Sequence, residues 1–224
     1  MKKIPTLFPK DPKNLKLVLN EKPIIEITND LEFYKKLDGR ACAIINGKLY
    51  TRYDAKLIRR KRGKVIKFSK EEIQKKIPKN AIPCQEPDEK SGHWPHWIPC
   101  NPKNKDHKYI FEAFENSLKI FEDMPNGTYE CIGPKVNANP HGLKNHFLIK
   151  HDSKLLKENF IDFESLKKDP YNYLKNFLTP FLFEGLVVWK NGEPIAKIRR
   201  GDFGLDVFSP IKYTNMFLDD FLKL

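Results

Sequence analysis

Two pairs of strand-like segments, each closed by Asn-Gly, dominate the pattern of hydrophobic and polar positions. One pair covers residues 40–53 around Asn46-Gly47, and the other covers residues 183–200 around Asn191-Gly192. Asn-Gly between two such runs favours a tight hairpin, because both turn residues adopt positive φ at little cost. The sequence therefore predicts two β-hairpins separated by most of the chain.

Helical spacing and capping signals predict further elements. Ser69-Lys70-Glu71-Glu72 is a capping box that begins a helix running to about Ile77, and apolar residues at helical spacing predict a second helix over 111–121. The remaining expectations are strands over 23–28, 128–132 and 146–150, a brief helix from Asn29 to about residue 35, a proline-rich ordered loop over 78–102, and a partly helical segment over 163–178.

A surplus of positive charge restricts the partners. The 224 residues contain 41 Lys and Arg against 29 Asp and Glu, a net charge of +12, which indicates nucleic acid or an anionic membrane surface. The basic run 59–64 is either a solvated face or a contact to nucleic-acid phosphates. No apolar run approaches the roughly 18 residues of a membrane span, and the first residues lack a secretory signal. We expect an intracellular protein, cytoplasmic or nuclear, that does not bind a membrane.

The cysteines do not form a recognisable metal or disulfide pattern. Four cysteines with no Cys-x-x-Cys pair fit a reducing compartment. A zinc set made of Cys84, His93, His96 and Cys100 is conceivable, but its spacing matches no common zinc site.

Counting along the second hairpin places opposite charges on one face. If Asn191-Gly192 is a two-residue loop, Glu184 lies opposite Arg199 and Leu186 opposite Lys197. Glu184, Lys197 and Arg199 then share one face, and the other face is formed by Val187, Trp189, Ala196 and Ile198. The charged face is either a solvated cross-strand ion pair or part of a site.

The same count on the first hairpin favours one arginine over another. Arg52 is predicted opposite Ala41 and on its face, whereas Arg40 points to the other face. Arg52 is therefore the better candidate for a phosphate contact.

Four short motifs follow one another in a characteristic order. They are Lys36-Leu37-Asp38-Gly39 before the first hairpin, Tyr129-Glu130-Cys131-Ile132-Gly133, Glu184-Gly185-Leu186-Val187-Val188, and Lys197-Ile198-Arg199. In this order they resemble the covalent nucleotidyltransferases, which comprise the ATP-dependent DNA and RNA ligases and the mRNA-capping guanylyltransferases. Residues 92–99, 130–143 and 203–205, the last before Pro210, are similar to a stand-alone 5′-to-3′ RNA ligase family of eukaryotes and large viruses. The resemblance extends from about Glu32 to Tyr213.

The resemblance implies a nucleophilic lysine. Lys36 would attack the α-phosphate of ATP to form lysyl-AMP, the adenylyl group would pass to an RNA 5′-phosphate, and a 3′-hydroxyl would then displace AMP. The implied catalytic residues are Lys36, Lys197 and Glu184. The implied nucleotide-binding residues are Asp38, Gly39, Arg52, Glu130, Phe147, Lys197 and Arg199, and the implied ligands of Mg²⁺ or Mn²⁺ are Glu184 and Glu130.

Some of these assignments carry alternatives. Arg199 stands where the wider superfamily often has a second lysine, and Ala41 stands where it often has an arginine, a place that Arg52 could fill. Phe147 either stacks on adenine or belongs to the core.

The implied fold is α+β, a nucleotidyltransferase (ATP-grasp-like) domain over residues 1–224. It has two twisted, largely antiparallel sheets around a nucleotide cleft and no OB-fold domain. We expect a monomer that acts on RNA with 5′-phosphate and 3′-hydroxyl ends. The alternatives are a capping guanylyltransferase or DNA ligase with the same lysine chemistry, which normally carry an OB-fold domain, and a non-catalytic basic RNA-binding protein.

Overall fold

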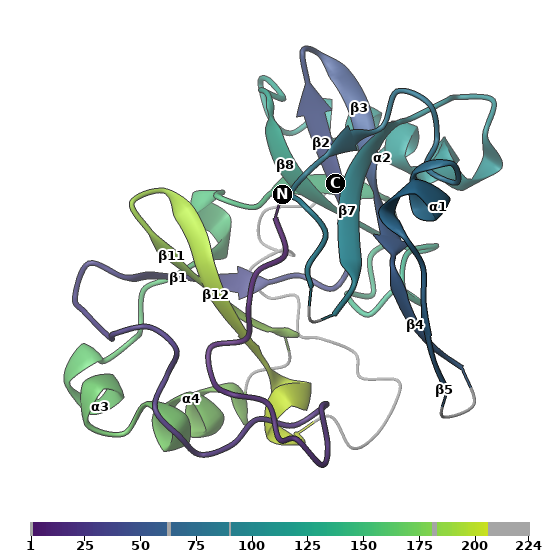
Figure 1. The fold of residues 1–224 in the computed structure, drawn as a ribbon. Helices are drawn as coiled ribbons and strands as arrows, with labels where there is room; N and C mark the ends of the chain where they lie inside the picture. Colours follow the sequence, from purple (N-terminus) through teal and green to yellow (C-terminus); the bar gives the residue numbers. More distant parts are fainter. Residues whose placement is uncertain (1, 62–63, 90, 181–182, 206–224) are drawn as a thin grey trace. The chain divides into compact units, whose positions relative to one another are not determined.

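The computed structural model describes residues 2–61, 64–89, 91–180 and 183–205 (Figure 1). It shows an α+β protein with a six-stranded and a four-stranded sheet, both antiparallel in their registered pairs, a two-stranded ribbon and short helices. This confirms the α+β class. The described residues form two compact units: unit 1 contains those of residues 2–3, 40–131 and 146–148, and unit 2 contains those of residues 4–39, 132–145 and 149–205. The segment that resembles the RNA ligase family was expected to extend past Pro210 to Tyr213, and both of these residues lie outside the described residues.

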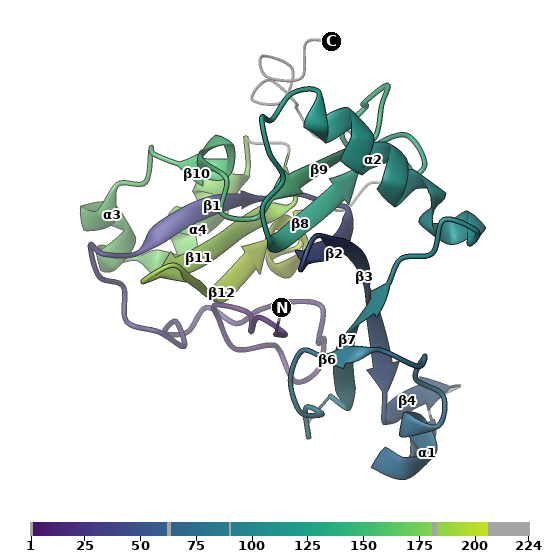
Figure 2. The same cartoon turned by 90° about the horizontal axis from the view of Figure 1, so that it is seen from above.

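The six-stranded sheet contains the first predicted hairpin (Figure 2). Its strands, in spatial order, are β6 (Ile82–Pro83), β7 (His93–Pro99), β3 (Lys48–Lys56), β2 (Arg40–Ile45), β8 (Gly127–Ile132) and β9 (Phe147–Lys150). The pair Cys42 and Thr51 confirms the register counted from the sequence.

Three helical segments belong to unit 1. They are α1 (Lys70–Gln74), η1 (Lys105–His107) and α2 (Lys108–Leu118). The predicted capping box at Ser69 is present, although α1 is shorter than expected. α2 buries Ile110, Ala113 and Ser117 at helical spacing, and the Ser117 hydroxyl accepts from the amide of Leu148 and donates to its carbonyl. A helix is therefore confirmed in this region, although it spans Lys108–Leu118 instead of 111–121, and Ser117 ties it to β9.

The predicted loop over 78–102 is wrong, because it contains β6 and β7. Prolines usually exclude a central strand, since they cannot donate to the ladder. β7 pairs along its whole length with β3, but its other edge meets only the two-residue β6, so Pro95 and Pro99 cost few hydrogen bonds. Burial of Trp94 and Trp97 stabilises the strand despite its prolines.

Unit 2 is built on the four-stranded sheet. Its strands, in spatial order, are β10 (Lys157–Glu158), β1 (Glu32–Lys36), β11 (Gly185–Lys190) and β12 (Glu193–Arg199), and its helical segments are η2 (Lys154–Leu156), α3 (Phe163–Lys168), α4 (Pro170–Leu178) and η3 (Arg200–Phe203). One core joins the sheet to α3 and α4 through side chains such as Phe33, Leu166, Leu174, Val188 and Ile198. The partly helical 163–178 segment is thus confirmed.

Two short predictions before β1 are wrong. Residues 23–28 form no strand, and the chain turns at 29–30 and enters β1 instead of a helix. Phe33 is 1% exposed because β1 lies between β10 and β11, and this tertiary pairing outweighs the local helix signal.

The second hairpin forms, but its predicted register holds for only two pairs, Lys190 with Glu193 and Trp189 with Pro194. Trp189 lies opposite Pro194, Val188 lies opposite Ala196, and Ile195 is the additional residue of a β-bulge. Pro194 has no amide hydrogen for the ladder, which favours an irregularity at this point. Beyond the bulge, Gly185 lies opposite Arg199 and Val187 opposite Lys197, not Glu184 and Leu186. As a result Leu186 and Val188 face the core, and Val187 shares the face of Lys197.

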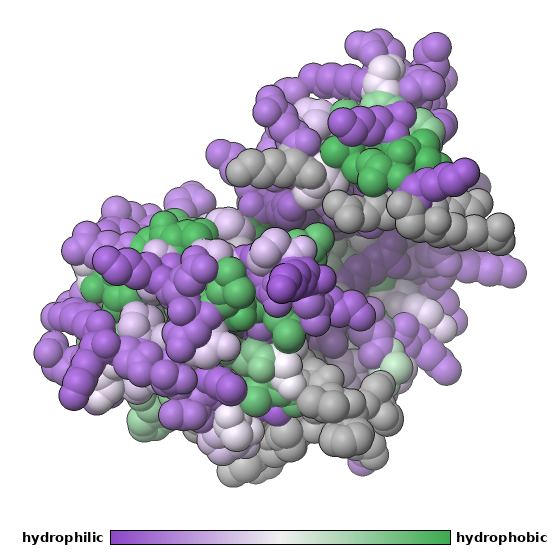
Figure 3. Space-filling model, turned by 60° about the horizontal axis from the view of Figure 1, so that its bottom comes forward, coloured by the Kyte–Doolittle hydropathy of each residue, from purple (hydrophilic) through white to green (hydrophobic). Residues whose placement is uncertain are grey.

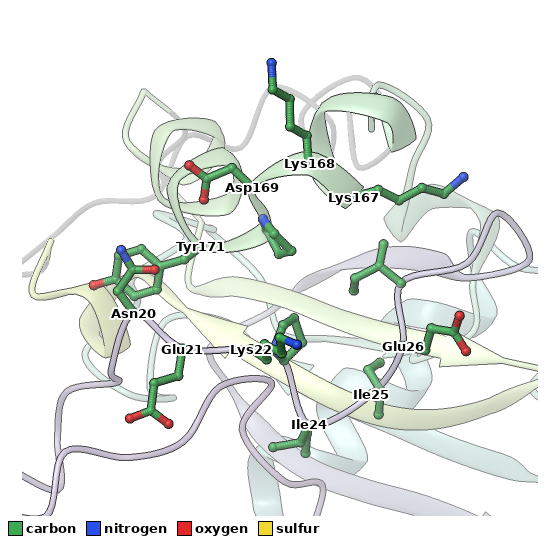
Figure 4. A pocket seen from close by; sticks show the side chains of 13 residues that line it. Asn20, Glu21, Lys22, Ile24, Ile25, Glu26, Lys167, Lys168, Asp169 and Tyr171 are labelled. Atoms are coloured by element: carbon green, nitrogen blue, oxygen red, sulfur yellow. The ribbon is translucent and has the colours of Figure 1, made fainter.

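Surface features of unit 2 include an open groove of about 760 Å³ between residues 20–27 and the junction of α3 with α4 (Figure 4). None of the residues that the sequence analysis selected for a site line it. On the face drawn in Figure 3, hydrophilic residues surround smaller hydrophobic patches. Across the described ranges, no helix is long and apolar enough to cross a membrane.

Candidate active site

Lys36 lies at the end of β1, where the sheet of unit 2 presents its polar face. The antiparallel register puts Gly185 opposite Lys36 on one side and opposite Arg199 on the other. The Lys36 ammonium donates to Glu184 Oε2 at 2.5 Å, and the two side chains are only 23% and 17% exposed. The structure thus brings together the first and third sequence motifs.

Gly185 is required by the close approach of β12. A Cβ at this position would lie 2.1 Å from the carbonyl oxygen of Ile198 and 2.6 Å from the Cα of Arg199. Any side chain would therefore push β12 away and move Arg199 relative to Lys36. Close packing against β12 therefore explains why the Glu184-Gly185 motif contains a glycine.

Lys197 is a partly buried cation on the same face. It lies opposite Val187, two residues before Arg199, and its neighbours on the inner face, Ala196 and Ile198, are fully buried. Its backbone is fixed on both sides: the amide donates to Pro5 O at 2.9 Å, and the carbonyl accepts from Leu7 N at 2.7 Å.

The environment of Lys197 disfavours its charge. Burial, followed by the positive charges of Lys36 and Arg199, lowers the pKa of Lys197 from 10.5 to about 8. Within the described part of the chain, no hydrogen bond or ion pair from its ammonium is present. A desolvated ammonium facing other cations is an arrangement that an anionic ligand would stabilise.

Arg199 is oriented by a buried carboxylate that the sequence analysis missed. Asp202, in η3, is 0% exposed and accepts from Arg199 Nε at 3.2 Å, from Arg199 Nη2 at 2.8 Å and from Lys10 Nζ. Burial alone would raise the pKa of Asp202, but the hydrogen bonds from Arg199 and Lys10 outweigh it and lower the pKa below 3.8. The position of Asp202, three residues after Arg199, was a sequence signal that could have indicated this pair. Nothing in the sequence around Lys10 indicated its contact with Asp202.

Two further missed residues hold Leu37–Gly39, the segment after Lys36, which we call the nucleophile loop after the role that the family resemblance implies for Lys36. Asn137 Nδ2 donates to Asp38 Oδ1 at 2.8 Å and to the Gly39 carbonyl at 2.9 Å, and the amide of Asp38 donates to His141 Nε2 at 3.1 Å. Because Nε2 accepts, this geometry requires the neutral ring with its proton on Nδ1. Asn137 and His141 therefore fix the backbone next to Lys36.

The segment that supplies them has an unusual backbone. Asn137, Ala138 and Asn139 have φ values of 46°, 59° and 56° in succession. Asn tolerates the left-handed region, but this conformation costs roughly 1 kcal/mol of conformational free energy at Ala138. Asn139 closes the turn by donating to the Leu143 carbonyl and accepting from its amide, both at 3.0 Å.

The predicted residues of unit 1 lie on its own sheet. Ala41 pairs with Glu130 on β8, and the β2–β3 register puts Ala41 opposite Arg52, so Arg52, Ala41 and Glu130 form a row on one face. Ala41 leaves space between the two longer side chains. Phe147 is only 2% exposed, which matches the core alternative, and its stacking on adenine stays a prediction.

The side chains of the described residues differ in how well they suit zinc and magnesium. Across the described ranges, no three His, Cys, Asp or Glu residues are grouped to hold a metal ion. His93 is bound to Asp54 and His96 to the Trp94 carbonyl, while burial raises the pKa of the Cys100 thiol to about 12, so the zinc alternative gains no support. Mg²⁺ instead takes one or two carboxylates together with phosphates and water. The Glu184 carboxylate, beside three cations that suit phosphates, fits that donor set.

Comparison with known proteins gives a consistent result at low identity. No family model matches the chain. RNA ligase 1 of Pongo abelii and RNA ligase 1 of Rattus norvegicus are each 26% identical to it, over 81% of this chain and 70% of the relative. The chain is thus similar, over most of its length, to proteins named RNA ligase.

Proposed function

We propose that the protein is an ATP-dependent RNA ligase that works through a lysyl-AMP intermediate. The observation that carries the proposal is the group on unit 2: Lys36 hydrogen-bonded to Glu184, next to a desolvated Lys197. The similarity to RNA ligase 1 proteins supports RNA as the substrate class. A protein that only binds RNA has no use for a carboxylate in this position, because the carboxylate repels the polyanion.

In the first step, Lys36 is the nucleophile. Its Nζ must lose a proton before it attacks, and Glu184 Oε2, at 2.5 Å, is in place to accept that proton. The new bond joins Nζ to the α-phosphorus of ATP, and the bond from that phosphorus to pyrophosphate breaks. The nucleophile loop, held by Asn137 and His141, keeps the lysine directed at the reacting phosphate.

Lys197 and Arg199 would bind the α-phosphate oxygens, where negative charge is shared in the transition state. At neutral pH the lowered pKa of about 8 still leaves most Lys197 side chains protonated. Desolvation strengthens the attraction between this ammonium and phosphate. A Mg²⁺ ion bound by Glu184 would supply further positive charge to the phosphates when it is present. The part of Glu130 in metal binding stays a prediction.

In the remaining steps, a 5′-phosphate oxygen of RNA attacks the α-phosphorus of lysyl-AMP and releases Lys36. A 3′-hydroxyl then attacks the activated RNA phosphate, forming the phosphodiester bond and expelling AMP. The same surface of cations can serve both nucleotidyl transfers, since each one passes through a charged phosphoryl group.

Intact-protein mass spectrometry tests this proposal directly. Incubation with ATP and Mg²⁺ should add one AMP to the wild-type protein, and Lys36→Ala should remain unmodified. Lys35→Ala is a matched control, since Lys35 points to the other face and pairs with Glu158. Protein from which bound nucleotide has been removed, and which still gains no AMP, would refute the proposal. An adduct from GTP alone would instead support a guanylyltransferase.

A further inference from the structure

Most of the net positive charge of the chain falls in one short segment. Residues 56–79 contain eleven Lys and Arg against two Glu, so this tenth of the sequence carries a surplus of nine of the chain's twelve net positive charges. The candidate active-site group of unit 2 uses none of these residues. Such a local excess is the electrostatic footprint of a polyanion-binding surface.

The segment folds into a distinct arm of unit 1. Among the described strands, β4 (Ile58–Lys61) and β5 (Lys64–Lys67) pair only with each other, and α1 follows β5 after two residues. Figures 1 and 2 both show this ribbon and α1 together at one end of β3, away from β8 and β9. We call β4, β5 and α1 the basic arm.

Backbone hydrogen bonds fix the base of the basic arm, although β4 and β5 pair with no further strand in the part of the chain that the structure describes. The Leu57 amide donates to the Gly92 carbonyl at 2.7 Å, and the Phe68 amide donates to the Leu57 carbonyl at 2.8 Å. Gly92 has φ +69°, and a Cβ there would lie 2.4 Å from the amide of Ile58, so the chain packs tightly where the ribbon begins. Two isolated strands are only marginally stable, which makes these contacts necessary.

Two cations, one from the ribbon and one from the turn that follows α1, lie over the same aromatic ring. Arg59 lies 5.5 Å and Lys76 lies 4.9 Å from the centre of the Phe68 ring. The ring stabilises each cation by a cation–π contact, but the two like charges repel each other. A bound polyanion would remove this repulsion.

The ribbon itself offers exposed charges that acids do not neutralise. Lys64 and Lys67 are exposed, and in the described ranges no carboxylate forms an ion pair with either of them or with Arg59. The register places Arg59 opposite Ile66 and Ile58 opposite Lys67, so cations lie on both faces of the ribbon. Both faces of the ribbon can therefore contact phosphates.

We propose that the basic arm binds the sugar-phosphate backbone of the RNA substrate, apart from the ends that are joined. The inference rests on the proposed RNA ligase function and adds a second contact to it. Val65 and Ile66 are exposed, at 53% and 40%, but two apolar side chains between cations on both faces do not form the one-sided apolar surface that membrane binding needs. Because lysine and arginine would meet phosphates rather than base edges, the contact has no sequence preference.

The test is the triple variant Arg59→Ala/Lys64→Ala/Lys67→Ala. Its affinity for a fluorescent 5′-phosphorylated RNA is measured by anisotropy over a series of salt concentrations, and lysyl-AMP formation is measured separately by intact mass. We expect the dependence of log K on log salt to become less steep by about 2 to 3, and affinity at about 100 mM salt to fall at least roughly tenfold. Lysyl-AMP formation from ATP should not change.

A second triple variant controls for net charge. Lys103, Lys105 and Lys119 are exposed lysines of the same unit outside the basic arm, and their replacement by alanine removes the same charge. An equal loss of RNA affinity in this control, or an unchanged salt dependence in the arm variant, would overturn the proposal. A charge-preserving variant, Arg59→Lys/Lys64→Arg/Lys67→Arg, should bind like wild type. If it fails as the alanine variant does, the effect is structural and the proposal falls.

Two other outcomes are informative. If wild type forms no lysyl-AMP, the proposed function fails, but the RNA-binding comparison still decides whether the basic arm binds RNA. The last comparison measures how wild type and the arm variant bind vesicles that contain phosphatidylserine. If the arm variant loses vesicle binding but keeps RNA binding, the basic arm binds a membrane surface and not RNA, and the inference is overturned.

Discussion

Replacing Lys197 with methionine should stabilise the protein while removing its activity. Methionine keeps most of the side-chain volume and removes the charge that burial and two neighbouring cations disfavour. The shift of the Lys197 pKa from 10.5 to about 8 means that folding disfavours the charged form, relative to the neutral form, by roughly 3 kcal/mol. The Lys197 side chain keeps some contact with solvent, which weakens this effect. We therefore expect Lys197→Met to raise the free energy of unfolding by about 1 to 2 kcal/mol at neutral pH and the Tm by roughly 2 to 8 °C.

The pH dependence follows from the direction of the shift. The folded state holds the Lys197 proton more weakly than the unfolded state, so the destabilisation is complete below pH 8 and disappears as the pH rises toward 10.5. The Tm difference between Lys197→Met and wild type should therefore shrink over that window. Circular dichroism melts in a buffer free of phosphate measure it, and intact mass should show a loss of lysyl-AMP formation of at least about a hundredfold.

A matched control and a ligand separate the electrostatic cause from general effects. Lys190 lies on the neighbouring strand and pairs with Asp30 at 3.2 Å with a half-exposed side chain, so Lys190→Met should change the Tm little. Pyrophosphate should raise the Tm of wild type more than that of Lys197→Met. The reasoning is refuted if Lys197→Met lowers the Tm equally at pH 7 and above pH 10, because the ammonium would then be stabilising in its present surroundings.

Three further substitutions test other contacts of the site. Gly185→Ala should cost about 2 to 4 kcal/mol of unfolding free energy, because its Cβ would meet the Ile198 carbonyl at 2.1 Å; denaturant unfolding measures this, and a loss under about 0.5 kcal/mol would contradict the steric argument. Asp202→Asn removes the buried partner of Arg199 and should cost about 3 kcal/mol at neutral pH. Because the pKa of Asp202 is lowered, the wild-type advantage should decline as the pH falls through the pKa of the folded state, and an advantage that stays constant down to pH 2 would argue against it. Asn137→Ala should slow lysyl-AMP formation by about tenfold to a hundredfold with ATP affinity nearly unchanged, whereas a change confined to affinity would refute a positioning role.

The sequence predicted the elements that depend on local signals. Both Asn-Gly hairpins and the Ser69 capping box form because turn and cap residues act within a few positions. The motifs that implied Lys36 and Glu184 as site residues lie far apart in sequence, and the structure joins these two side chains by a hydrogen bond, while their catalytic roles stay a prediction. The register at Lys197 did not follow from counting, since a single bulged residue, Ile195, moves every later pair by one.

The supports of the site were not predictable from local patterns. Asn137 and His141 reach the nucleophile loop from about a hundred positions away in sequence, and nothing in their own neighbourhood indicates a partner. The Lys10 contact to Asp202 joins residues that are 192 positions apart. Such contacts depend on the tertiary fold, which is set by burial rather than by spacing along the chain.

The central position of β1 has a consequence for how the protein is made. Lys36 and Glu184 are separated by 148 residues, and β1 has no sheet neighbour until β10 and β11 have been synthesised. Closing so long a loop is entropically costly and slow. During translation Lys36 is therefore synthesised 148 residues before Glu184, and Lys197 and Arg199 follow later still. Under the proposed function, a chain that ends before Glu184 should gain no AMP from ATP, so the gain of AMP would report that β11 has joined β1.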